Sequence, residues 1–143
     1  MFYTITHIHD AALAWLKLSD LKAVCSTIET YNGEAQDLIE DVKSLTIDYP
    51  AALVFYGGSQ FSSEGSSPFI DTFMLTIVLV AKDLRSGDDI RASMYAMLEE
   101  VKKMKDQTLG LEISPLAIAR IRLLRVTKIV SIYAVDFTTV FEM

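Results

Sequence analysis

The chain has little cysteine, histidine, proline or glycine. Among 143 residues there are one cysteine, two histidines, three prolines and six glycines. Cys25 alone cannot form an internal disulfide, and its isolation leaves any metal site to other ligands. The glycines Gly57, Gly58 and Gly87 lack the strand, glycine pattern and lysine of a phosphate-binding loop. These shortages favour a reducing compartment and exclude disulfide-framework and P-loop proteins.

Residues with catalytic chemistry do not occur in recognisable groups. His7 and His9 are two residues apart, so they point to opposite sides of a strand or far apart around a helix. A nucleophilic Cys25 or serine would need a base held by a third group, and no such spacing is present. We therefore expect no catalytic, cofactor-binding or metal site, and an enzyme with an unrecognised site is the least favoured alternative.

Long hydrophobic runs are also missing. The longest, from Phe73 to Ala81, is well short of the roughly 20 residues that a membrane-spanning helix needs. The first residues lack a basic region before the apolar ones and make a poor secretory signal. We expect a cytoplasmic product without a membrane partner.

The composition is that of an ordinary globular chain, with 51% hydrophobic and 22% charged residues. A chain of this size buries roughly 70% of its unfolded surface as one domain. We expect residues 1–143 to form a single domain, with some extra apolar surface for partners.

Charge is unevenly distributed along the chain, whose net charge is −6. Residues 1–100 carry 6 basic and 15 acidic side chains, a net of −9, and residues 101–143 carry 7 basic and 4 acidic, a net of +3. Such polarity suits head-to-tail contact between identical subunits, although a solvated charge imbalance would look the same. An acidic chain is not expected to bind nucleic acid, which needs a concentrated basic face.

Apolar periodicity predicts three helices, over residues 5–16, 35–45 and 88–104. The third carries an apolar stripe made of Ile90, Met94, Met97, Val101 and Met104. A methionine-rich stripe can mark an adaptable binding groove, but a helix that faces the core explains it more simply.

Strands are predicted over residues 22–29, 51–56 and 69–82, the last long and central. Between the second and the third, Gly57 to Pro68 is rich in glycine and serine and is predicted to be a hairpin loop. This loop, which holds Gln60 and Phe61, is either a tolerated surface excursion or a segment that orders on a partner.

The last 36 residues predict a β-hairpin that holds three of the five arginines. With Thr127 to Ile129 as a three-residue loop, Arg120 lies opposite Asp136, Ile121 opposite Val135 and Arg122 opposite Ala134. One face is then apolar and the other displays a basic row. These arginines either contact a neighbouring subunit or pair with Asp136 inside the chain while their tips are solvated.

The predicted elements together indicate an α+β fold, a mixed or antiparallel sheet with helices packed on it. Their order resembles a family of small proteins of Mu-like phages and prophages, encoded beside the tail-sheath gene and similar in organisation to tail terminators. The resemblance spans residues 5–141. Its fixed points are Pro50, the Leu-Gly-Leu at 109–111 and the aromatic closing strand.

The resemblance implies a structural protein with no catalytic residues. It implies a subunit of a hexameric ring that caps the finished tail tube and prepares head-tail joining, with a tail-terminator-like α/β sandwich. The expected partners are other copies of the chain, tail tube and sheath proteins, and head-tail connector proteins. It would assemble in the host cytoplasm and remain in the virion tail.

The expected contact residues are Arg120, Arg122, Arg125 and Asp136, together with Gln60 and Phe61 in the 57–68 loop. Replacing Arg120 and Arg122 by glutamate is expected to block assembly while the monomer stays folded. The alternative to a tail subunit is a small non-enzymatic adaptor domain that binds another protein.

Overall fold

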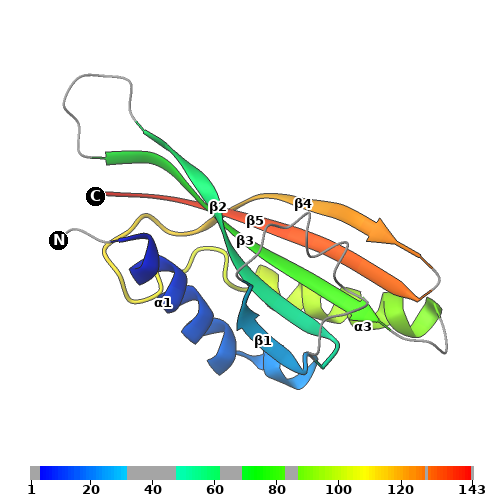
Figure 1. Ribbon diagram of the computed structural model, residues 1–143. Helices are drawn as coiled ribbons and strands as arrows, with labels where there is room; N and C mark the ends of the chain where they lie inside the picture. The colour runs from blue at the N-terminus through cyan, green and yellow to red at the C-terminus, as the bar shows by residue number, and fades with distance from the viewer. Residues whose placement is uncertain (1–3, 32–47, 62–68, 83–86, 128, 143) are drawn as a thin grey trace.

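The fold is a mixed β-sheet with helices packed on one face (Figure 1). The computed structural model describes residues 4–31, 48–61, 69–82, 87–127 and 129–142, which form a five-stranded sheet. In chain order the elements are α1 (Ile5–Leu18), the 3₁₀ helix η1 (Asp20–Ala23), β1 (Thr27–Thr30), β2 (Ala51–Phe61), β3 (Phe69–Lys82), α3 (Gly87–Lys102), β4 (Ala117–Val126) and β5 (Val130–Glu142). The predicted α+β fold is confirmed, whereas the helix predicted over residues 35–45 lies outside the described residues.

The order of the strands across the sheet is β1-β2-β3-β5-β4. Among the described strands, β1 and β2 pair in parallel, and the other three pairs are antiparallel. The prediction of a long central strand over residues 69–82 is confirmed, because β3 lies between β2 and β5. β1 and β4 are the two edge strands, and β1 has only four residues.

Helix α1 begins and ends with defined caps. The Thr4 hydroxyl accepts a hydrogen bond from the His7 amide, while His7 Nδ1 accepts one from the Thr4 amide. This reciprocal capping pairs two amides that would otherwise lack partners at the start of the helix. Ile8, Ala12 and Leu16 are fully buried, as their spacing predicted.

The strand predicted over residues 22–29 is partly wrong. Ser19 ends α1 and its hydroxyl accepts a hydrogen bond from the Leu21 amide, which starts η1. The strand begins only at Thr27, because local side-chain capping offers the backbone an alternative to the sheet. Alternation of small and β-branched residues between Val24 and Ile28 did not reveal this turn.

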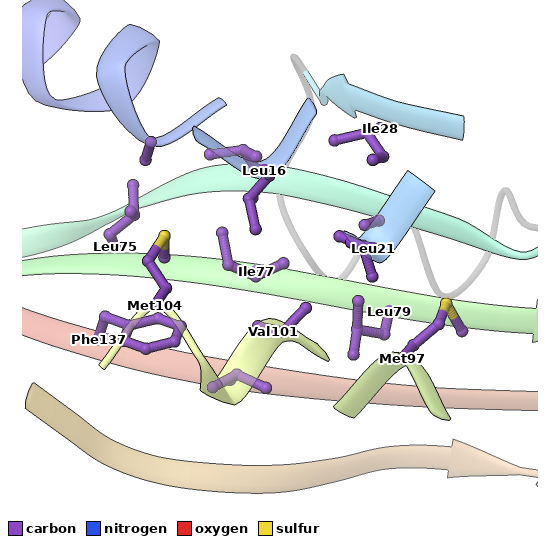
Figure 2. Close-up of a cluster of buried hydrophobic side chains, with 14 of the residues drawn as sticks. Leu16, Leu21, Ile28, Leu75, Ile77, Leu79, Met97, Val101, Met104 and Phe137 are labelled. Atoms are coloured by element: carbon purple, nitrogen blue, oxygen red, sulfur yellow. The ribbon is translucent and has the colours of Figure 1, made fainter. Parts of the chain in front are cut away.

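The main core lies between the sheet and helices α1 and α3. Leucine and methionine side chains from α1 and α3 meet Leu75, Ile77 and Leu79 of β3 and Phe137 of β5 (Figure 2). The apolar stripe predicted for this helix is buried, with Met94, Met97 and Val101 fully inaccessible to solvent. The helix ends at Lys102 rather than at residue 104, so Met104, also buried, lies in the turn that follows α3. The interpretation of α3 as a core-facing helix is therefore confirmed.

Strand β2 continues through part of the predicted loop. It runs to Phe61 rather than stopping at Tyr56, with an irregular register between Tyr56 and Gly58. Gly58 has a φ of 110°, a value that favours glycine. The C-terminal end of β2 and the N-terminal end of β3 curve away from the helices, and the C-terminal end of β5 pairs with β3 there (Figure 1). We call residues 57–61, 69–74 and 138–142 the arm.

Candidate functional site

The closing hairpin has the register that the sequence predicted. β4 ends at Val126 and β5 begins at Val130, so three residues connect them. Arg120 pairs with Asp136, Ile121 with Val135 and Arg122 with Ala134. Register shifts between Ile118 and Arg120 and between Leu123 and Arg125 were not predicted. The second shift keeps Arg125 on the same face of the sheet as the other two arginines, opposite Ile132.

Asp136 is the centre of a cluster of polar side chains and has no accessible surface. Its Oδ2 accepts hydrogen bonds from Arg120 Nε at 2.7 Å and from Arg122 Nε at 2.8 Å. Its Oδ1 accepts one from Arg122 Nη2 at 3.1 Å and one from the Thr76 hydroxyl at 2.6 Å. Arg122 thus holds the carboxylate with two parallel bonds, a geometry that lysine cannot reproduce.

These contacts keep Asp136 ionised. Burial opposes its charge, but the hydrogen bonds from Thr76, Arg122 and Arg120 outweigh the burial and lower the pKa of the carboxyl below its ordinary value. The two arginines remain partly in water, with side chains 58% and 34% exposed for Arg120 and Arg122. Of the two interpretations of the arginines, pairing with Asp136 inside the chain therefore applies to Arg120 and Arg122.

Gly57 of β2 lies next to Thr76 of this cluster, on the strand that pairs with β3. A Cβ on Gly57 would lie 2.8 Å from the Thr76 hydroxyl oxygen and 2.8 Å from Met74 Cγ. Because Thr76 is held by Asp136, only a residue without a side chain fits here without displacing that hydroxyl.

The opposite face of β4 carries apolar side chains that none of the described helices covers. We call Ile121, Leu123 and Val126 the β4 apolar row; they are 43%, 57% and 58% exposed. Their partners in β5 lie on the face of the sheet that α3 covers. Beside the row, a hollow of about 300 Å³ lies between α3 and the hairpin, lined by Ile90, Met94, Tyr95, Val126, Ser131 and Tyr133 among others. Contiguous exposed apolar surface of this kind is typical of protein contacts.

The predicted site residues occupy two separate places. The three arginines and Asp136 lie on the β4–β5 hairpin, and Arg125 is exposed, with no ion pair or hydrogen bond in the described part of the chain. Gln60 and Phe61 lie in β2, opposite Thr72 and Ile70, rather than in a loop. β3 and β5 separate β2 from β4, so one copy does not bring the two groups together.

The described residues offer little reactive chemistry. Burial raises the pKa of the Cys25 thiol to about 11, and the thiol donates to the backbone oxygen of Thr27, so it is not a thiolate at neutral pH. His7 caps a helix and His9 Nε2 lies 2.8 Å from the Thr30 hydroxyl. Within the described ranges no three His, Cys, Asp or Glu side chains could hold a metal ion together.

None of the helices in the described ranges is long and apolar enough to span a membrane. A comparison with curated proteins found no match. A comparison with protein families matched residues 4–142 to the family described as "Bacteriophage Mu, Gp37". That match covers nearly the whole sequence, including α1, α3, the sheet and the hairpin. The chain therefore belongs to the bacteriophage Mu Gp37 family.

Proposed function

We propose that the chain is a structural subunit of a phage tail, the terminator that caps the finished tail tube as a hexameric ring and prepares head-tail joining. The observation that carries this proposal is edge strand β4, with the β4 apolar row on one face and three arginines on the other. An edge that is open and apolar in a monomer is suited to a permanent contact with another protein. Membership of a Mu phage family supports a role in the particle.

The partners of such a subunit are its own copies, the tail tube and sheath proteins, and the head-tail connector. Its contact set is formed by Arg120, Arg122 and Arg125 with Gln60 and Phe61, while the buried Asp136 holds two of these arginines in place. The protein acts by shape and charge, with no catalytic step. It assembles in the host cytoplasm and stays in the virion tail.

Deletion of the gene from the phage tests this function. Electron microscopy of the particles should then show tails of irregular length or tails without heads, because nothing stops the tube or joins it to the head. A wild-type copy supplied in trans should restore normal particles. Normal particles from the deletion would exclude the terminator role. They would favour an adaptor domain that binds another protein through the β4 edge.

A further inference from the structure

Strand β4 is exposed along its outer edge and on both faces. It pairs with β5 and with no other strand of the described residues. None of its ten residues is buried, although every one except the three arginines is apolar. Such an edge presents unpaired backbone N–H and C=O groups that can bind another strand.

The arginine face of β4 carries positive charge that the chain does not balance. Among the residues of β5 that pair with β4, Asp136 is the only acidic one, so it neutralises one arginine of three. Asp136 takes Nε of Arg120 and Nε and Nη2 of Arg122. Within the described residues, both Nη groups of Arg120 and the guanidinium of Arg125 make no hydrogen bond. These donors fit carboxylates.

A strand that pairs with β4 has to match both faces. Side chains alternate between the two faces of a strand, and cross-strand neighbours share a face. Every second side chain of the added strand would therefore lie beside the arginines, and the others beside the β4 apolar row. The complementary sequence alternates carboxylates with apolar residues. A phosphate backbone would match the arginines but neither the apolar row nor the open edge.

This chain does not itself contain such a sequence. Nowhere in its 143 residues do two acidic residues stand two positions apart. β1, the other edge strand, has one acidic residue, Glu29, which pairs with Lys17. The part of β2 beyond β1, from Phe55 to Phe61, has none. The complementary strand therefore belongs to a different protein.

We propose that an extended segment of another protein, with carboxylates at alternate positions and apolar side chains between them, adds to the β4 edge as a further strand of the sheet. Its carboxylates face the three arginines, and its apolar side chains cover the β4 apolar row. This inference rests on the proposed function, because it names the chemistry of a partner that the tail subunit binds. Backbone hydrogen bonds supply affinity, and the alternate side chains supply specificity.

A designed peptide tests the binding mode. The probe is fluorescein-Ser-Val-Glu-Val-Glu-Val-Glu-Val-Ser-amide, whose anisotropy is followed as the full chain is added. The matched control has the same composition with its glutamates and valines in separate blocks. We expect the block peptide to bind about tenfold more weakly, because it cannot place carboxylates on one face and valines on the other. Equal affinities would overturn the inference, since charge attraction alone would explain them.

Methylated amides test whether the backbone pairs. The N–H groups of successive residues point to opposite sides of a strand. Methylation of the glutamate amides removes one row of donors, and methylation of the valine amides removes the other. One of these two peptides should lose binding while the other keeps it. Equal affinities of the two would contradict strand addition.

Variants of the chain and hydrogen exchange locate the site. Arg125→Gln should weaken binding about fivefold, the factor that corresponds to an exposed ion pair of about 1 kcal/mol. Lys22→Gln removes an exposed charge on η1, outside the hairpin, and should leave binding unchanged. The amides of β4 should exchange more slowly with the peptide bound. Slower exchange in the arm alone would place the peptide elsewhere and overturn the assignment.

The outcomes separate this inference from the proposed function. No binding of the alternating peptide would overturn the inference, and deletion of the gene would still decide the tail role. Binding at β4 together with normal particles from the deletion would support strand addition and exclude the terminator. An oligonucleotide that displaces the peptide, or β4 amides that become protected at high protein concentration without peptide, would identify nucleic acid or a second copy as the occupant and overturn the inference.

Discussion

At the scale of single residues, the structure of the candidate site depends most on Asp136. It is a buried carboxylate with four hydrogen bonds from Thr76, Arg120 and Arg122. Asp136→Asn removes the charge that both arginines require and leaves the buried site with mismatched donors. We expect a loss of about 2–4 kcal/mol in the free energy of unfolding, measured by urea denaturation at neutral pH. A loss below about 0.5 kcal/mol would mean that water satisfies the arginines equally well.

The same residue should make stability depend on pH. Its pKa is lower in the folded chain than in the unfolded one, so its contribution is complete above the unfolded pKa, near 4, and is lost as the pH falls through the folded pKa. We expect wild type to lose more stability than Asp136→Asn between about pH 5 and pH 2. Parallel curves for the two chains in urea titrations would contradict this.

Arg120 and Arg122 are poor probes of assembly. Replacing both by glutamate would place two more carboxylates beside the buried Asp136, so we expect the double variant to unfold rather than to remain a folded monomer. Arg125→Glu should keep its fold, because Arg125 is exposed and has no ion pair in the described part of the chain. Circular dichroism melting curves distinguish the two, and a double variant that melts like wild type would contradict this.

At the scale of elements, α3 separates buried from exposed positions on one helix. Met97 has no accessible surface and Tyr95 is 53% exposed. Met97→Ala should cost about 2–5 kcal/mol through lost contacts and the cavity that remains. Tyr95→Ala should change stability by about 0.5 kcal/mol or less. Equal losses in thermal or urea denaturation would show that the hollow beside Tyr95 is part of the core.

Local patterns predicted elements where side-chain periodicity alone decides the structure. The β4–β5 register followed from the alternation of Arg120 and Arg122 with apolar residues, and β3 followed from its long apolar run. The 57–61 segment of β2 was missed because glycine and serine resemble a loop, although pairing with β3 holds them in a strand. η1 was missed because its start depends on a cap at Ser19.

Only part of the candidate site could be predicted from the sequence. Arg120 and Asp136 are 16 residues apart in one hairpin, so a register argument reaches them. Thr76 is 60 residues from Asp136, and its hydroxyl meets the carboxylate only because β3 and β5 are neighbours in the sheet. The exposure of the β4 apolar row depends on α3 covering β3 and β5 but not β4, which is a property of packing rather than of sequence.

At the scale of the whole molecule, the charge pattern should govern association. Residues 1–100 carry a net charge of −9 and residues 101–143 a net of +3, so a head-to-tail contact places unlike charges together. The Debye length falls from roughly 10 Å at 0.1 M salt to roughly 3 Å at 1 M. Exposed charges that lie farther apart than this length are largely screened from each other. We expect self-association, measured by sedimentation velocity, to weaken as salt rises.

Two substitutions separate the electrostatic from the apolar share of binding at β4. Arg125→Gln removes an exposed charge, so it should flatten the salt dependence of binding to the alternating peptide while binding at high salt changes little. Leu123→Ala shortens an exposed member of the β4 apolar row, so it should weaken binding equally at every salt concentration. An Arg125→Gln chain that keeps the wild-type salt dependence would show that the basic face of β4 meets solvent rather than the carboxylates of an added strand.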